Sequence, residues 1–312
     1  MQAVGITEWG PPEVLHLVEL PDPVPGEGEI LIRVRAATVN PTDTQLRSGE
    51  RAERLKDVPG PHVPGMEAAG TVEAFGPGVT SDLRAGDRVF AIVLPLGTHG
   101  AYAERTAVPA ESVAAAPPSA TFAEAATLPM NGLTARLALD VLELPRGAVL
   151  AVTGAAGGLG GYVVQLAKAA GLHVVADAAP ADRSLVAALG ADEIVDRGAD
   201  MALRVRERHP NGVDAVVDAA LLLDAVTPAV RDGGAVVTVR GYSGPDGRGV
   251  TWHPIFVRNY AREQAKLRSL SRLAEEGVLT MRVARTLPAV AAPEAHRLLD
   301  GGGIRGRIVL EF

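Results

Sequence analysis

The sequence predicts an α/β protein with a compact β barrel in its N-terminal part and a helix-covered parallel sheet after it. Three observations lead to this fold class. At about 150 residues per domain, a chain of 312 residues suggests two domains. Residues 1–118 contain short strands of period 2 separated by Gly/Pro turns, which is typical of a barrel. After Pro117-Pro118, apolar strands alternate with helices, the pattern of βαβ units.

The clearest strand of the N-terminal part spans 30–36. Apolar residues at every second position there alternate with Arg33 and Arg35, which indicates a half-buried strand. Further strands are expected at 70–75, 88–93 and 101–108, because Gly and Pro mark turns between them.

The remainder of the chain is expected to build a parallel sheet covered on both faces. Strands are expected at 148–153, 173–177, 193–195, 213–218 and 235–240, and helices at 122–144, 158–170, 181–189, 221–230 and 258–276. The chain then ends in a strand at 281–287, a helix at 293–300 and a strand at 307–312.

Composition excludes several classes of function. The formal charge of −7 argues against a nucleic-acid partner, since such proteins usually carry a positive field. The absence of cysteine excludes disulfides, thiolate catalysis, iron–sulfur clusters and Cys-ligated zinc. Neither a secretory signal nor an apolar stretch long enough for a membrane span is visible. We therefore expect a cytoplasmic protein with no membrane partner.

The strongest local signal is the glycine-rich stretch Thr153-Gly154-Ala155-Ala156-Gly157-Gly158-Leu159-Gly160-Gly161. It follows an apolar strand and opens a helix, as a dinucleotide-binding fingerprint requires. Glycines let backbone N–H groups approach a pyrophosphate, and the helix N-terminus favours that anion. Ala156, Gly157, Gly158 and Leu159 are therefore predicted to bind the cofactor; the alternative is a turn that only packs against a helix.

Two charged residues bear on which nicotinamide cofactor is used. Asp177 lies 19 residues beyond Gly158, near the spacing of the acid that accepts the ribose hydroxyl of NAD. Its carboxylate would repel the 2′-phosphate of NADP, whereas Arg183 could pair with that phosphate. The alternative for Asp177 is a turn or capping residue.

Ordered motifs also run along nearly the whole chain. They are Val39-Asn40-Pro41-Thr42-Asp43, Pro64-Gly65-Met66-Glu67-Ala68-Ala69-Gly70, Gly86-Asp87-Arg88-Val89, Gly100-Ala101-Tyr102-Ala103-Glu104, Leu128-Pro129-Met130-Asn131-Gly132-Leu133-Thr134-Ala135, the loop at Gly157, and Gly306-Arg307-Ile308-Val309-Leu310. In this order they resemble the medium-chain dehydrogenase/reductases, and within them the zinc-free NADPH:quinone reductases similar to zeta-crystallin. The resemblance implies a GroES-like domain, 1–118 plus 285–312, and a Rossmann domain, 119–284.

The metal ligands of the zinc-dependent relatives are missing here. Where those relatives have a Cys-His pair, this chain has Asn40 and Pro41, and where they have Gly-His-Glu it has Gly65-Met66-Glu67. The seven histidines are scattered, and a catalytic zinc needs about three protein ligands. We therefore expect no metal. Without a Lewis acid, the remaining chemistry is hydride transfer to an acceptor that is already electrophilic.

The resemblance also implies site residues. Asn40 is expected beside the nicotinamide and the acceptor, as a catalytic and cofactor-binding residue; its alternative is a turn residue. Thr127 and Asn131 are expected near the cofactor, with helix capping as the alternative. The cofactor-binding set is completed by Val239, Arg240 and Gly241.

The function expected from this resemblance is zinc-independent hydride transfer from NAD(P)H to a quinone-type acceptor. NADPH is the expected cofactor, with NADH possible because of Asp177. The alternatives are an enoyl or alkenal C=C reductase and an NADPH-binding regulatory protein without turnover. Gln45 stands where many bacterial relatives have a tyrosine, which puts the acceptor class in doubt. A homodimer is expected from the resemblance and from an expected sheet edge at 235–240.

Overall fold

The computed structural model describes all 312 residues and divides into two compact units. Unit 1 consists of Met1–Met130, Ala261–Glu275 and Met281–Phe312, and unit 2 of Asn131–Tyr260 and Glu276–Thr280. The expected α/β fold is confirmed, because unit 1 holds a mainly antiparallel sheet and unit 2 a parallel one. The domain limits expected from the sequence stay a prediction.

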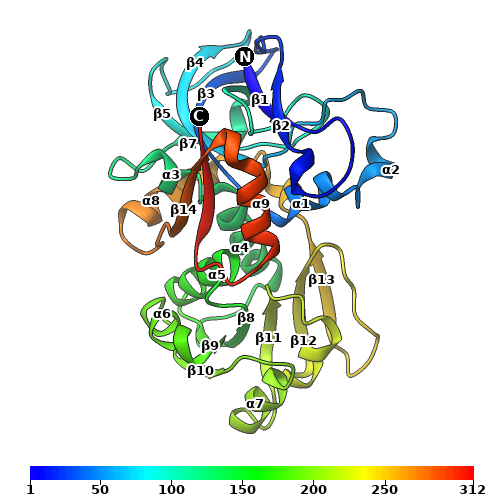
Figure 1. Cartoon of the computed structure of the whole chain (residues 1–312). Coiled ribbons are helices and arrows are strands. Elements are labelled where there is room, and N and C mark those ends of the chain that lie inside the picture. The colour runs from blue at the N-terminus through cyan, green and yellow to red at the C-terminus, as the bar shows by residue number, and fades with distance from the viewer. The chain divides into compact units, whose positions relative to one another are not determined.

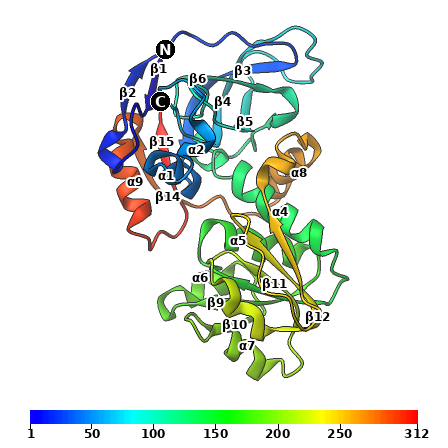
Figure 2. The same ribbon diagram turned by 90° about the vertical axis from the view of Figure 1, so that its right-hand side faces the viewer.

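The main sheet of unit 1 has the strand order β14-β15-β3-β4-β5-β7. Strand β15 pairs with the C-terminal part of β3, and β6 pairs with its N-terminal part. Its strands are β3 (Glu29–Thr38), β4 (Glu67–Phe75), β5 (Arg88–Ile92), β6 (Arg105–Pro109), β7 (Val113–Ala115), β14 (Val283–Pro288) and β15 (Arg307–Glu311). All these pairs are antiparallel except β14–β15. The C-terminal strand β15 therefore lies beside β3, from the first part of the chain (Figures 1 and 2).

Strand β3 shows why the sequence pattern predicted this sheet. Ile30, Ile32 and Val34 are buried, whereas Arg33 and Arg35 between them are exposed. The apolar face thus packs into the core of unit 1 and the arginines meet solvent. A separate hairpin-like pair, β1 (Gln2–Gly5) and β2 (His16–Glu19), packs apolar residues on the same core.

Short helices complete unit 1. They are α1 (Pro41–Ser48), α2 (Ala52–Leu55), α3 (Phe122–Ala125), α8 (Gln264–Glu275) and α9 (Ala292–Asp300), with 3-10 turns at Pro12–Val14, Ala110–Ser112 and Ala289–Ala291. Helix α4 (Pro129–Leu142) begins in unit 1 and continues into unit 2.

Unit 2 contains a six-stranded, wholly parallel sheet in the order β10-β9-β8-β11-β12-β13. The strands are β8 (Val149–Thr153), β9 (His173–Ala178), β10 (Glu193–Asp196), β11 (Val213–Asp218), β12 (Val230–Val239) and β13 (Thr251–Ile255). The helices are α5 (Gly158–Ala169), α6 (Arg183–Ala188) and α7 (Met201–Arg208), with 3-10 turns at Pro180–Asp182, Leu223–Ala229 and Val257–Tyr260. Helix α7 contacts β10 and the 3-10 turn Leu223–Ala229, and its Met201, Ala202 and Val205 pack on the core of this sheet (Figure 2).

Three expectations about elements beyond residue 220 are wrong. The stretch 235–240 is not a sheet edge, because β13 pairs with β12 and takes that place. The expected helix at 221–230 is a 3-10 turn, since Pro228 lies inside it and Leu221 and Leu223 adopt positive φ. The helix expected at 258–276 begins only at Gln264, after a 3-10 turn.

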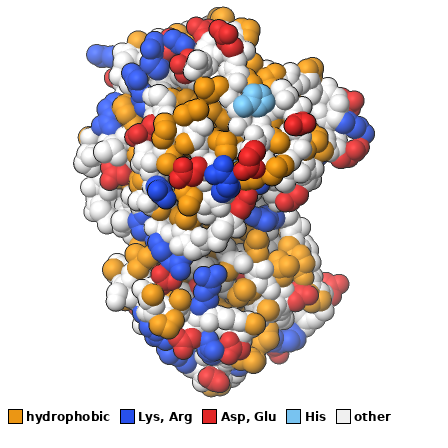
Figure 3. All heavy atoms as spheres, in the orientation of Figure 1, with side chains coloured by type: hydrophobic (Ala, Val, Ile, Leu, Met, Phe, Trp, Pro, Cys, Tyr) orange, Lys and Arg blue, Asp and Glu red, His pale blue; other side chains and the backbone are white.

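The surface charges and the length of the helices indicate which kinds of partner the protein could bind. On the face drawn in Figure 3, basic and acidic side chains are interspersed over both units. None of the helices combines the length and the hydropathy that crossing a membrane requires.

Candidate functional site

The carboxyl edge of the parallel sheet in unit 2 gathers most of the predicted cofactor residues. From β8 the chain adds β9 and then β10 on one side of the sheet, and it then returns to add β11 on the other side of β8. In parallel sheets, ligands bind at this point of reversal, outside the carboxyl ends of the strands. The glycine-rich loop follows β8, Asp177 lies near the end of β9, and Val239 ends β12. The sheet therefore brings these three groups to one edge.

The glycine-rich loop is shaped by close backbone contacts. Gly154 adopts φ +65°, and a Cβ on Gly160 would lie 2.3 Å from the Gly154 carbonyl oxygen, so Gly160 admits no side chain without a shift of the loop. Gly157 is the N-cap of α5, and the first helical bond runs from Gly161 N to Gly157 O. The N–H groups of the first turn, at Gly158 and Leu159, therefore have no partner within the helix, which is the usual arrangement for binding a phosphate.

Asp177 lies beneath this loop. Its Oδ1 accepts the N–H of Ala155 at 3.1 Å, while its Oδ2 is buried without a hydrogen-bond partner. The side chain is only 2% exposed, and burial raises the pKa of the carboxyl group, although the Ala155 N–H and Arg197 oppose this. Asp177 thus positions the loop in this structure, and contact with a ribose stays a proposal.

Two further predicted positions lie at the same edge of unit 2. Arg183 begins α6 and pairs with Asp196, the last residue of β10, at 2.6 Å. Both side chains are about half exposed, so this ion pair contributes little to stability. A competing anion can therefore replace Asp196 as the partner of Arg183. At the end of β12, Arg240 and Gly241 both adopt positive φ, which turns the chain sharply after Val239.

Unit 1 holds a second polar cluster, around the predicted residue Asn40, which is almost wholly buried. Asn40 is the N-cap of α1, and its Oδ1 accepts a hydrogen bond from Arg307 Nη2 at 2.6 Å. Its Nδ2 donates to Glu67 Oε1 at 3.1 Å. Arg307 Nη2 also lies 2.6 Å from Glu67 Oε1, and Thr38 donates its hydroxyl to the same oxygen. Glu67 Oε2 accepts the N–H of Met130 at 2.7 Å, so both carboxylate oxygens are engaged.

This cluster does not fit a zinc ion. Glu67 Oε1 is already paired with a guanidinium, and the Asn40 oxygen accepts from the same group. The polar groups around Glu67 include neither an imidazole nor a thiolate, the donors that zinc prefers. Met66 occupies the neighbouring position with a weakly donating thioether. We therefore derive no step through a metal here.

Asp43 holds the turn after Asn40. Its Oδ2 accepts the N–H of Asn40 at 2.8 Å, and its Oδ1 accepts the N–H of Gly65 at 2.9 Å. Tyr102 donates its hydroxyl to Asp43 at 3.4 Å, and that hydroxyl lies 3.2 Å from Nε2 of His296. Asp43, Tyr102 and His296 thus form a buried polar chain, which could not be predicted because its members lie far apart in the sequence.

Burial shifts the two titrating ends of this chain in opposite senses. It raises the pKa of Asp43 to about 7 and lowers the pKa of His296 to about 3. The native state therefore holds a proton on Asp43 that the unfolded chain releases above pH 4, and it excludes a proton from His296 that the unfolded chain binds below pH 6.5. Between these values the two contributions to the pH dependence of stability have opposite signs.

We therefore predict opposite effects of two substitutions on the free energy of unfolding. Relative to wild type, Asp43→Asn should gain stability as the pH rises from about 4 to 7, because the cost of ionising a buried carboxyl disappears. His296→Gln should gain stability as the pH falls from about 6.5 to 3. Each relative change should be at most on the order of 5 kcal/mol. Urea unfolding across this pH range measures both, and parallel profiles for wild type and variants would refute the assignment.

Three further positions singled out in the sequence, Thr127, Asn131 and Gln45, lie in unit 1 or at its boundary. Thr127 is buried, and its hydroxyl donates to the Glu124 carbonyl at 2.8 Å, at the C-terminal end of α3. Asn131 lies in the first turn of α4 and is half-buried. Gln45 donates to Glu50 at 3.0 Å and accepts from Arg51 at 2.8 Å, so its amide is held in a polar pair on both sides.

Comparison with known proteins shows which family the chain resembles. Residues 26–118 match the family model described as the alcohol dehydrogenase GroES-like domain, and residues 189–310 match that described as zinc-binding dehydrogenase. An NADPH-dependent alkenal/one oxidoreductase of Arabidopsis thaliana is 35% identical over 79% of this chain, which spans 64% of that relative's length. The quinone oxidoreductase of Sus scrofa is 28% identical over 99% of this chain and 97% of its own.

Solved structures extend the likeness over the whole chain. A mycobacterial protein complexed with NADPH is 32% identical and has a TM-score of 0.86, and an NAD-dependent alcohol dehydrogenase is 31% identical with a TM-score of 0.87. Each alignment covers 100% of both chains. The GroES-like and Rossmann folds expected from the motifs are thereby confirmed. The chain belongs to the medium-chain dehydrogenase/reductases, within their quinone oxidoreductase-like family.

Proposed function

We propose that the protein is an NADPH-dependent oxidoreductase that transfers hydride to a quinone-type acceptor without zinc. The observation that carries the proposal is the buried Asn40–Glu67–Arg307 cluster, which offers no ligand set for a metal. With no Lewis acid to polarise a simple alcohol or ketone, the acceptor must itself be electrophilic. Quinones and α,β-unsaturated carbonyls meet this requirement.

The residues of unit 2 would bind the cofactor by its anionic groups. The N–H groups at the start of α5 would hold the pyrophosphate, whose negative charge the helix dipole favours. Asp177 fixes the loop from below through Ala155. When bound, the nicotinamide supplies a hydride, the acceptor takes it together with a proton from water, and the hydroquinone leaves.

Asn40 is proposed to act beside the acceptor. Its side chain is held between Glu67 and Arg307, so it cannot rotate without breaking hydrogen bonds to a buried ion pair. This rigidity suits a group that positions a reacting ring. Thr127, Asn131 and residues 239–241 are proposed to contact the cofactor.

The preference for NADPH over NADH depends on two charges. Arg183 is available to a 2′-phosphate in exchange for its exposed partner Asp196, and a bidentate arginine–phosphate pair is strong. The carboxylate of Asp177 repels this phosphate only if the Asp177 side chain reaches the ribose. The mycobacterial structural relative binds NADPH, which favours the phosphate.

We expect Asp177→Ser to shift the ratio of kcat/KM for NADPH and NADH toward NADPH, because it removes a carboxylate near the proposed phosphate site. Steady-state rates with both cofactors measure the ratio. Glu207→Ser is the control, since it removes one exposed carboxylate of α7 and leaves both Asp177 and the Arg183–Asp196 pair in place; its ratio should equal that of wild type. A ratio within a factor of two of wild type in Asp177→Ser would mean that Asp177 acts on the loop alone.

A second candidate is reduction of a C=C bond in an enone or alkenal. It is favoured by the 35% identity to the Arabidopsis alkenal/one oxidoreductase and by Gln45, which gives no aromatic ring to stack on a quinone. The experiment is NADPH oxidation with a panel of quinones and enones. Turnover with quinones supports the first proposal, turnover with enones alone supports the second, and turnover with neither leaves the regulatory, non-enzymatic alternative.

We also propose a homodimer, now through a different edge. β13 is the last strand of the parallel sheet, so one side of its backbone is open to pairing with a second copy. Light scattering at micromolar concentration should give twice the monomer mass of 32.3 kDa. A monomer mass would contradict this proposal.

A further inference from the structure

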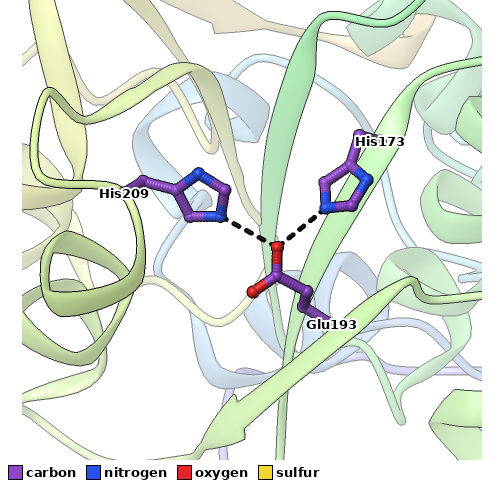
Figure 4. A group of neighbouring side chains, drawn as sticks. All are labelled: His173, Glu193 and His209. Carbon is purple, nitrogen blue, oxygen red and sulfur yellow. Dashed lines mark hydrogen bonds and ion pairs between the residues drawn. The ribbon is translucent and has the colours of Figure 1, made fainter.

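A cluster of two histidines and one glutamate lies at the other end of the parallel sheet in unit 2. His173 begins β9, Glu193 begins β10, and His209 follows the last residue of α7. Figure 4 shows both imidazoles pointing at the Glu193 carboxylate from opposite sides. Nε2 of His173 lies 2.8 Å from Glu193 Oε1, and Nε2 of His209 lies 3.0 Å from the same oxygen.

The three ligand atoms converge on one point. All lie within 4.8 Å of one another, and the imidazole centroids are 6.2 Å apart. Two ligands of a tetrahedral zinc ion, each about 2.0–2.1 Å from the metal, are about 3.3 Å apart. Small side-chain shifts of a few tenths of an ångström to about 1 Å would therefore open the N–O distances enough for an ion between them.

We propose that His173, Glu193 and His209 form a site for a divalent transition-metal ion such as Zn²⁺. Two imidazole nitrogens and one carboxylate oxygen are a common donor set for this ion, and water would complete the coordination. The side chains are 39%, 25% and 19% exposed, so the ion can reach the site from solvent.

Neighbouring charges are arranged around the site in a way that leaves these three atoms available. Arg208 lies 3.5 Å from Oε2 of Glu193 and leaves Oε1 to the histidines. On the far side of His173, Nδ1 lies 3.8 Å from Asp192 Oδ2, and Asp192 is itself held by Lys168 at 2.7 Å. A metal on Nε2 requires the proton of His173 on Nδ1, and a carboxylate facing that nitrogen favours this tautomer.

The proposed site is separate from the proposed cofactor site. His173 is the first residue of β9 and Asp177 is four residues further on, which corresponds to about 13 Å along a strand. The metal would join β9, β10 and the end of α7, and so would stabilise unit 2 without taking part in hydride transfer. The expectation of no catalytic metal is unaffected.

The proposal is tested by titrating chelator-treated, full-length protein with Zn²⁺ alone in an isothermal calorimeter. We expect one equivalent to bind with a Kd of about 10 μM or below, corresponding to about −7 kcal/mol. His173→Gln and His209→Gln should each weaken binding by about 30-fold or more. Saturating Zn²⁺ should raise the Tm of wild type by about 4 °C and leave that of His209→Gln unchanged.

The matched control is His16→Gln, which removes an exposed imidazole in β2, outside the cluster. It should bind Zn²⁺ as wild type does. Absence of wild-type binding at 100 μM Zn²⁺, or equal binding in all variants, would overturn the proposal and leave only two His–Glu hydrogen bonds. If a variant fails to fold, the visible spectrum of wild type with Co²⁺ decides: bands of a tetrahedral, imidazole-ligated ion support the site, and the spectrum of the hydrated ion refutes it.

Discussion

Replacing Arg307 with methionine is expected to lower the free energy of unfolding by about 3–5 kcal/mol. The substitution keeps much of the apolar volume but removes the guanidinium that Glu67 and Asn40 share. Glu67 is wholly buried, so its carboxylate would be left charged without a cation. Urea unfolding monitored by circular dichroism measures the loss.

Two controls separate this effect from the loss of any arginine. Arg33→Met removes an exposed partner of Glu73 and should cost about 1 kcal/mol or less. Adding Glu67→Gln to Arg307→Met should restore part of the stability, because no unpaired charge then remains. Equal losses for Arg33→Met and Arg307→Met would show that the buried pair contributes no more than a surface one.

Gly158→Val is expected to weaken NADPH binding at least 10-fold, or by about 1.4 kcal/mol. Gly158 is the first residue of α5, where a Cβ points back toward the helix N-terminus and the proposed pyrophosphate. Fluorescence titration with NADPH measures the dissociation constant.

Ala169→Val is the matched control for this prediction. It adds two methyl groups to the exposed last residue of the same helix. Its NADPH affinity should equal that of wild type. An unchanged affinity in Gly158→Val, with an intact fold, would place the cofactor away from this loop.

The fold could be predicted where one element carries its own pattern. Alternation along β3 and the repeated strand–helix order of unit 2 are properties of consecutive residues. The edge strand was missed for a local reason: Pro254 lies inside β13, and proline argues against a strand unless that strand is at an edge. The strand expected at 235–240 begins earlier, at Val230, and includes Gly233-Gly234.

The candidate sites were predictable only in part. The glycine-rich loop, the strand before it and the helix after it form one continuous segment, so the sequence predicted a dinucleotide site there. Glu67 and Arg307 are 240 positions apart, and no local pattern pairs them. His173 and His209 are likewise brought together only by the pairing of β9 with β10 and the return of α7. Contacts of this kind follow from topology, which sequence periodicity does not specify.

The most direct test of zinc-independent hydride transfer is the rate of NADPH oxidation by a soluble benzoquinone, before and after exhaustive treatment with a chelator. The buried Asn40–Glu67–Arg307 cluster predicts turnover that is unchanged by the treatment. Using His209→Gln alongside wild type keeps the proposed metal site on unit 2 out of the result. Turnover that disappears on chelation in both proteins and returns with Zn²⁺ would contradict the account.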